Sequence, residues 1–198
     1  YVERPNFFER IQQGEVVGYV IVGVGLLGVI LAAFQYFYLF VTRTAVKAQL
    51  SKLSSPDAGN PLGRLVLAFR GEQPAANAEV AELRLSEAVL REVPKLERFQ
   101  SFLRLAVAAG PLLGLVGTVI GMILTFHAIV ASGSSDPRIM ADGIGQAMIA
   151  TVLGLGIAIP LLFINSGLSK LSTGLTQILD EHSHTLLAKY LGEHTENS

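Results

Sequence analysis

Two threonines, Thr118 and Thr151, stand at equivalent positions on either side of a turn-forming stretch. The midpoint between them falls at Ser134-Ser135, so each lies about 16 residues from the centre of the turn at 133–137. If the flanking stretches are antiparallel helices, both hydroxyls lie at one level, on the order of 20 Å from the turn. Such a pair can coordinate water or hydrogen-bond a polar group from another helix. Either threonine alone would indicate little, because its hydroxyl can bond the carbonyl four residues earlier.

Charged side chains are absent from three long stretches, 16–42, 105–135 and 143–169. His127 is the only side chain in them that titrates near neutral pH. Its distance in sequence from Thr118 puts it on roughly the opposite helix face, as an interfacial or packing histidine. Proton relays through membranes usually depend on an acid or a base. If this protein conducts protons, the carboxylate must therefore come from a partner subunit.

Enzyme chemistry has little support in the sequence. The absence of cysteine excludes a disulfide framework, a thiol nucleophile and a Cys-ligated metal. No nucleophile–base pair and no cluster of metal ligands is recognisable, so we expect no catalytic residues, no metal and no cofactor. The formal net charge of −1 gives no electrostatic reason to expect a nucleic-acid partner.

The elements that position the two threonines are apolar helices. The chain is 51% hydrophobic and 16% charged, against about 25% charged in a typical soluble domain. Each uncharged stretch exceeds the about 20 residues that cross a bilayer core. The sequence therefore predicts an all-α membrane protein with three long transmembrane helices and cytoplasmic helical extensions.

The distribution of Lys and Arg sets the orientation of these helices. Ten of the fifteen basic residues lie between Arg43 and Arg104, whereas the turn between the second and third helices has only Arg138. The long segment is therefore expected in the cytoplasm, with the N-terminus in the periplasm and the C-terminus in the cytoplasm. The predicted parts are a periplasmic or interfacial segment (1–15), transmembrane helix 1 (16–42), a cytoplasmic helical segment (43–104), transmembrane helix 2 (105–131), a periplasmic turn (132–142), transmembrane helix 3 (143–169) and a cytoplasmic tail (170–198).

One further pattern precedes the first predicted membrane helix, and another lies within its last residues. Phe7, Phe8 and Ile11 share a helical face, which suits either a short helix on the outer membrane surface or an ordinary lead-in. The aromatic stretch at 34–40 is typical of a membrane-interface belt. The chain opens on Tyr1 rather than Met, so we expect residues upstream of it.

The predicted cytoplasmic segment contains one clear turn region, at 54–61. A helical pattern begins after Pro74 and meets no strong breaker before the second membrane helix. We therefore expect one long helix, with Pro94 and the Gly110-Pro111 pair as its only points of kinking. Its charged face is either solvated or packed against identical copies of itself.

Small residues recur at helical spacing in the second and third apolar stretches. Such residues let membrane helices approach closely. The simplest interpretation of this pattern is a tightly packed helix interface. The predicted packing positions are Gly114, Gly121, Ala147, Gly154 and Ala158.

Two segments carry a family resemblance. The sequence GPLLGLVGTVIGM at 110–122 and the sequence GIGQAMIATVLGLGIAIP at 143–160 resemble the second- and third-helix signatures of the MotA/TolQ/ExbB proton-channel family. The resemblance covers about 90–170. Flagellar MotA proteins have four spans, so three spans favour the ExbB/TolQ branch, and within it the ExbB type of the TonB system.

The resemblance implies a ring of identical subunits, a homopentamer, around a central pore in the bacterial inner membrane. Thr118 and Thr151 match the pore-lining threonines on the proton pathway. An ExbD-like single-span protein would supply the transmembrane Asp, and a TonB-like protein would carry the work of the proton motive force to outer-membrane import.

One position departs from the family pattern. Many members have glutamate five residues before the third-helix threonine, where this chain has Gln146. Gln146 is a polar candidate for the pore lining that can hydrogen-bond but cannot exchange a proton. Two alternatives remain open: a TolQ-type subunit of the Tol-Pal system, and a non-conducting oligomeric scaffold. A solute transporter is disfavoured by the lack of an internal repeat or intramembrane charge.

Overall fold

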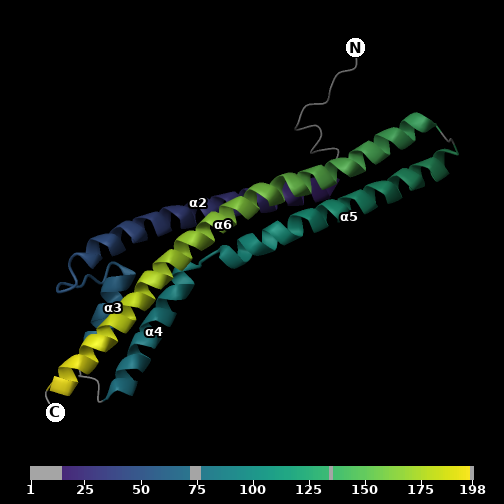
Figure 1. The fold of residues 1–198 in the computed structure, drawn as a ribbon. Helices are drawn as coiled ribbons and strands as arrows, with labels where there is room; N and C mark the ends of the chain where they lie inside the picture. Colours follow the sequence, from purple (N-terminus) through teal and green to yellow (C-terminus); the bar gives the residue numbers. More distant parts are fainter. Residues whose placement is uncertain (1–14, 72–76, 134–135, 197–198) are drawn as a thin grey trace. The chain divides into compact units, whose positions relative to one another are not determined.

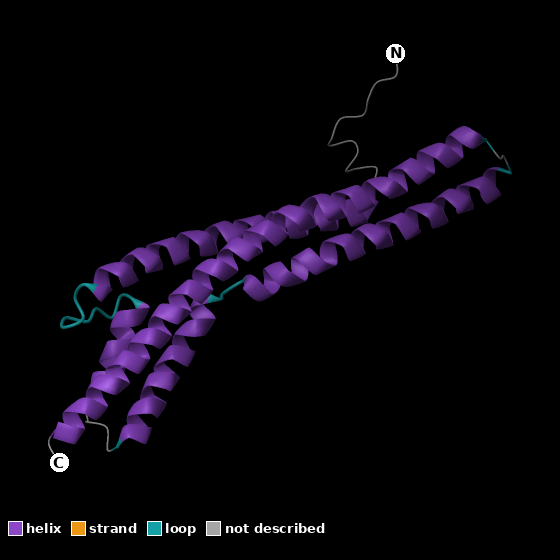
Figure 2. Ribbon diagram, in the orientation of Figure 1, coloured by secondary structure: helices purple, strands orange, loops and turns teal. Residues whose placement is uncertain are grey.

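The computed structural model describes residues 15–71, 77–133 and 136–196. These residues form helices α2 (Glu15–Leu50), α3 (Pro61–Arg70), α4 (Ala78–Leu96), α5 (Gln100–Ser132) and α6 (Pro137–Glu196) (Figure 1). The described part of the chain contains helices and loops and no strand (Figure 2). The predicted all-α class is therefore confirmed, whereas the N-terminal surface helix falls outside the described residues.

Three of the helices, α2, α5 and α6, are long and apolar enough to cross a membrane. The stretches that meet this criterion are Val16–Leu50, Gln100–Ser132 and Pro137–Gly192. Each is longer than the membrane helix predicted from the sequence, at 16–42, 105–131 and 143–169 respectively. A helix suits such surroundings because it satisfies its backbone N–H and C=O groups internally, without water.

The chain divides into two compact units, each assembled from segments far apart in the sequence. Unit 1 comprises residues 1–32 and 101–166, and unit 2 comprises residues 33–100 and 167–198. Helices α2 and α6 contribute to both units.

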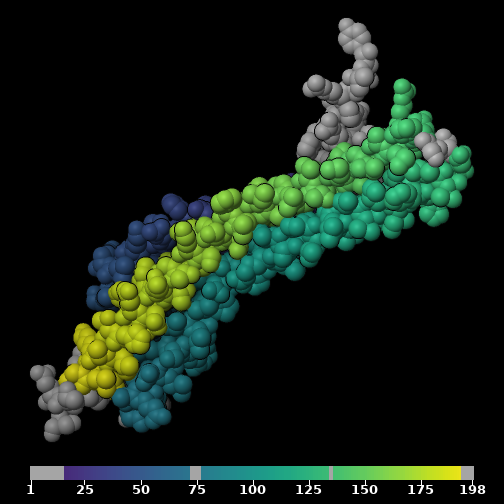
Figure 3. Space-filling view, turned by 45° about the vertical axis from the view of Figure 1, so that its right-hand side comes forward, coloured from purple at the N-terminus to yellow at the C-terminus, as the bar shows by residue number. Residues whose placement is uncertain are grey.

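Unit 1 contains a hairpin of α5 and the first part of α6, with the first part of α2 packed on it. Figure 3 shows α6 in green lying directly along α5 in teal. Glycines of α2 allow its close approach: a Cβ added at Gly25 would lie 2.7 Å from Cγ2 of Ile157, and one at Gly28 would lie 3.1 Å from Cδ2 of Leu161. Small residues on α2 thus bring it into direct contact with α6.

Unit 2 has an apolar core supported by capped helices. Asn60 accepts a hydrogen bond from the Gly63 N–H at the start of α3, and Asn77 does the same for Val80 at the start of α4. The turn region predicted at 54–61 and the helix predicted after Pro74 are both present. The fully buried apolar side chains of unit 2 include Leu39, Leu62, Leu65, Leu96, Leu168, Leu175 and Leu179.

An ion pair between the half-buried Arg64 and the buried Glu92 links α3 to α4 within unit 2. Arg64 Nη2 lies 2.7 Å from Oε2 of Glu92, and Lys95 Nζ lies 3.1 Å from Oε1. Burial disfavours the Glu92 carboxylate, but hydrogen bonds from Arg64 and Lys95 outweigh it and hold the pKa of Glu92 below its ordinary value.

The prediction of one continuous helix from the cytoplasmic segment into the second membrane helix is wrong. Helix α4 ends at Leu96 and α5 begins at Gln100. Between them Phe99 has a φ of +65°, a left-handed conformation that redirects the chain. Both predicted kink points, Pro94 and Pro111, lie inside helices that continue through them.

A side chain from another helix accounts for the end of α4. Gln35 of α2 is fully buried, and its Nε2 donates to the Leu96 carbonyl at 2.9 Å and to the Lys95 carbonyl at 3.3 Å. These carbonyls lack intrahelical partners at a helix terminus, and an external donor satisfies them. The ring of Phe99 meets Phe34 edge-on, with centroids 6.2 Å apart. Gln35 and Phe34 lie in the stretch predicted as an aromatic belt, and Gln35 has a structural role that the pattern does not reveal.

Candidate functional site

The two helices of the unit 1 hairpin are in near backbone contact. A Cβ added at Gly114 would lie 3.0 Å from both the Ala150 carbonyl oxygen and the Thr151 Cα, and one at Gly121 would lie 2.7 Å from the Ala147 Cβ. Helix α5 therefore tolerates no side chain at these glycines without moving away from α6. The predicted packing positions thus lie on the face where the two helices meet.

The same contact face continues along the hairpin in the direction away from the turn. A Cβ added at Gly110 would lie 2.8 Å from the Gly154 carbonyl oxygen and 3.1 Å from the Ala158 Cβ. Gly154 and Ala158 are buried there. Contacts from Gly110 to Gly121 therefore follow one antiparallel register along the hairpin.

Thr118 and Thr151 meet across this interface. Their Oγ1 atoms are 2.5 Å apart, and both residues are half-buried. The Gly114 carbonyl lies 3.1 Å from Thr118 Oγ1 and 3.3 Å from Thr151 Oγ1, and the Ala147 carbonyl lies 3.3 Å from Thr118 Oγ1. The common level expected from their symmetric placement about the turn is therefore present.

The hydrogen bonds of the threonine pair can be counted. Each hydroxyl has one hydrogen to donate. One threonine donates to the other, and the second donates to a backbone carbonyl, for which Gly114 is available to either of them. Both hydrogens are thus used within the hairpin, while lone pairs remain. For either hydroxyl to donate to an outside group, it must first release one of these bonds.

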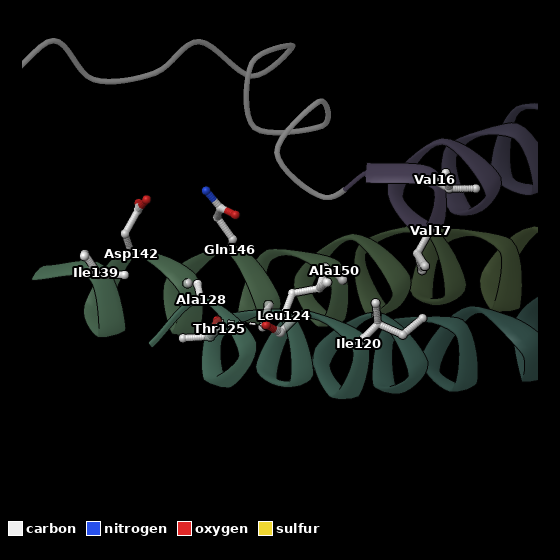
Figure 4. A pocket seen from close by; sticks show the side chains of 14 residues that line it. Val16, Val17, Ile120, Leu124, Thr125, Ala128, Ile139, Asp142, Gln146 and Ala150 are labelled. Atoms are coloured by element: carbon white, nitrogen blue, oxygen red, sulfur yellow. Dashed lines mark hydrogen bonds between the residues drawn. The ribbon is translucent and has the colours of Figure 1, made fainter. Parts of the chain in front are cut away.

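Gln146 makes no hydrogen bond to either threonine. It is half-buried and lines a cavity of about 480 Å³ between α2, α5 and α6 in unit 1 (Figure 4). The cavity extends from Ile139 and Asp142 near the turn to Gly117 and Ala150, the residues next in sequence to the two threonines. The sequence does not reveal this cavity, because its walls come from three helices and only their packing creates it.

Another close contact lies nearer the turn. Thr125 is buried and donates to the Gly121 carbonyl at 2.8 Å, and its side chain occupies the space where Gly143 would carry a Cβ. Gly143 was not among the predicted packing positions. The signal in the sequence that could have identified Gly143 as a packing position is that it lies eight residues before Thr151 on the same helix.

Ionisable groups are scarce at the hairpin. His127 is exposed and lies outside the cavity lining. Within the part of the chain that the structure describes, no group of three His, Cys, Asp or Glu side chains could hold a metal ion. The site therefore consists of two hydroxyls, backbone carbonyls and closely packed small residues.

A family model matches residues 42–181, and its description is the MotA/TolQ/ExbB proton channel family. The match covers the last nine residues of α2, all of α3, α4 and α5, and most of α6, including both threonines. The chain belongs to this family. With three helices able to cross a membrane, it is a multi-pass membrane protein of a proton-channel family rather than a member of a known enzyme class.

Similar proteins carry the names of two branches of the family. The chain is 32% identical to biopolymer transport protein exbB1 of Vibrio cholerae, over 81% of this chain and 76% of that protein. It is 30% identical to an ExbB homologue of Methanothermobacter thermautotrophicus, over 79% of this chain and 62% of that protein. It is 37% identical to the Tol-Pal system protein TolQ of Haemophilus influenzae, over 41% of this chain and 36% of that protein.

Proposed function

We infer that this protein is an ExbB-type proton-channel subunit of the bacterial inner membrane, which uses the proton motive force to energise TonB-dependent import across the outer membrane. The ExbB-named relatives support this type, because two of them align with about four-fifths of the chain. The TolQ relative aligns with 41% of it. In this proposal the N-terminus is periplasmic and the C-terminus cytoplasmic.

The threonine pair carries the proposal. Its two hydroxyls lie at one level of the hairpin, and the stretches 105–135 and 143–169 that form the hairpin contain no Asp or Glu. In the proposed assembly five copies form a ring, and Thr118 and Thr151 of each copy line the pore. A partner with a single transmembrane helix, of the ExbD type, supplies an aspartate at this level, and a TonB-like protein receives the work.

The energetics of such a partner are favourable. An unpaired Asp at the bilayer centre costs about 2.5–3.5 kcal/mol on insertion scales. A hydroxyl that exchanges its carbonyl acceptor for this carboxylate replaces a neutral hydrogen bond of about 1 kcal/mol by a charged one of about 1.5–3 kcal/mol. The threonine pair can therefore stabilise the charged form of the partner's Asp. When that Asp is protonated, the hydroxyl returns to the Gly114 carbonyl.

Substitution of the two hydroxyls tests the proposal. We expect Thr118→Val and Thr151→Val each to lower proton flux in proteoliposomes containing the partner by at least about tenfold, because each removes a hydrogen bond of about 1.5–3 kcal/mol to the charged form of the partner's Asp. Thr118→Ser and Thr151→Ser retain a hydroxyl and serve as controls that keep most of the flux. The assembled complex should co-purify unchanged in all four variants.

Normal flux in both valine variants would contradict the channel proposal. The hairpin would then serve as a non-conducting scaffold, an alternative consistent with hydroxyls that are satisfied within the chain.

A TolQ-type role is the second candidate, and the TolQ relative favours it. The two candidates differ in their partner. Purification of the tagged protein from its native membrane, followed by mass measurement of the intact complex, identifies the single-span partner and counts the copies. An ExbD-like partner in association with a TonB-like protein supports the ExbB type, and a partner belonging to the Tol-Pal system supports the alternative.

A further inference from the structure

The cavity of unit 1 is half open to its surroundings, and it combines apolar walls with two polar side chains on α6. Its fourteen lining residues include Asp142 and Gln146 of α6, one turn apart. Figure 4 shows both side chains leaving α6 on the same side, with Val16 and Val17 of α2 at the opposite end of the cavity. Asp142 is exposed at the end near the turn, and Gln146 is half-buried deeper inside.

Neither polar side chain has a partner among the described residues. No hydrogen bond or ion pair is formed there by the carboxylate of Asp142 or by the amide of Gln146. Polar groups among apolar helices are costly unless they are hydrogen-bonded. At about 30 Å³ for each molecule, a cavity of 480 Å³ has room for on the order of ten waters. Water is therefore the natural partner of both groups.

The inner end of the cavity approaches the threonine pair. Gly117 and Ala150 line that end, and each directly precedes one of the two threonines in sequence. Asp142 is the only titratable residue among the described lining residues. Other ionisable groups nearby in the sequence are Asp136 just before α6, Arg138 on α6 and His127 on α5, and none of these three lines the cavity.

We propose that this cavity is a water-filled vestibule and that Asp142 at its mouth collects protons for the threonine pair. The Asp142 carboxylate takes a proton from a hydronium ion, which leaves a water molecule and a carboxylic acid. The acid then releases the proton to water inside the cavity and becomes a carboxylate again. Gln146, which cannot exchange a proton, holds water between the mouth and the inner end. The proposal rests on the proposed proton-channel function.

Cysteine labelling tests the vestibule without measuring proton flux. The chain contains no cysteine, so Leu124→Cys provides a unique thiol in the cavity wall. A small membrane-impermeant thiosulfonate, added from the side of the turn, should modify it, because the reactive thiolate forms where water is present. A cationic reagent should react faster than an anionic one. Asp142→Asn should lower the ratio of the cationic to the anionic reaction rate by about threefold or more, because it removes one nearby negative charge.

Phe126→Cys is the matched control for labelling. It is two residues away on α5, is similarly exposed, and lies outside the cavity lining, with exposed fractions of 56% for Phe126 and 49% for Leu124. Asp142→Asn should leave its ratio of cationic to anionic reaction rates unchanged. Failure of Leu124→Cys to react, or a ratio that Asp142→Asn does not change, would overturn the vestibule.

Proton flux tests the role of Asp142. We expect Asp142→Asn to reduce flux several-fold and Asp142→Glu to restore it. Asp136→Asn, which removes a carboxylate near the same end of α6 but outside the cavity, should have no effect. Normal flux in Asp142→Asn, together with loss of flux in Thr118→Val, would refute the role of Asp142 and leave the channel standing. Normal flux in Thr118→Val and Thr151→Val would instead refute the channel, while the labelling result would still report on the cavity.

Discussion

At the residue scale, the distance between the two threonine hydroxyls depends on glycine. Gly114 lets α5 and α6 approach, and its carbonyl oxygen is within hydrogen-bonding distance of both hydroxyls. Gly114 therefore contributes to the close spacing of the pair and offers an acceptor to either hydroxyl. The proposed pore chemistry requires this geometry, since a separated pair would no longer act together on one carboxylate.

Gly114→Ala tests this dependence. The added methyl would lie 3.0 Å from the backbone of α6, so the helices must shift apart, at a cost of about 1–3 kcal/mol. We expect a lower thermal unfolding midpoint in detergent and reduced proton flux. Gly156→Ala is the matched control, because a Cβ at Gly156 meets nothing within 4 Å. Equal effects of the two substitutions would show that close packing at Gly114 is not the cause.

At the element scale, the end of α4 depends on a contact from α2. Gln35 supplies the donor for two terminal carbonyls of α4, and the chain then turns through Phe99. Gln100, the first residue of α5, is also buried, and its Nε2 donates to Ser172 Oγ of α6 at 2.7 Å. Two buried amides thus hold the segments on either side of the break within unit 2.

Gln35→Leu should destabilise unit 2. Leucine is apolar and similar in volume to glutamine, but it leaves the Lys95 and Leu96 carbonyls without this donor. A buried polar group left without a hydrogen-bond partner costs about 1–3 kcal/mol. Faster amide hydrogen exchange in α4 would report the loss. Gln177→Leu, at an exposed position of α6, is the control and should leave exchange in α4 unchanged. Unaltered exchange in Gln35→Leu would show that the α4 terminus does not need this bond.

At the scale of the whole molecule, the ion pair of Arg64 with Glu92 makes stability sensitive to acid. The folded-state pKa of Glu92 lies below its ordinary value of about 4.5, so the pair stabilises the protein above that pH. This contribution is lost as the pH falls through the lowered folded-state pKa. Because Arg64 and Glu92 lie on different helices, protonation of Glu92 weakens the connection between α3 and α4.

Glu92→Gln should therefore make the stability of the protein less dependent on pH in the acid range. We expect the wild-type unfolding midpoint to fall more steeply below about pH 4.5 than that of the variant. Glu87→Gln, which removes an exposed carboxylate from the i,i+4 pair with Arg91, should retain the wild-type slope. Identical slopes in wild type and Glu92→Gln would exclude Glu92 as a contributor to acid sensitivity.

The sequence by itself determined the helical class, the three helices able to cross a membrane and the common level of Thr118 and Thr151. These features follow from local properties: apolar length, the constant rise of a helix and equal distances from one turn. Only the tertiary structure decided the break between α4 and α5, the role of Gln35 and the cavity that joins Asp142 to Gln146. Each of these depends on side chains from helices far apart in sequence. Gln35, for example, bonds carbonyls 60 and 61 residues away, a contact that no local pattern encodes.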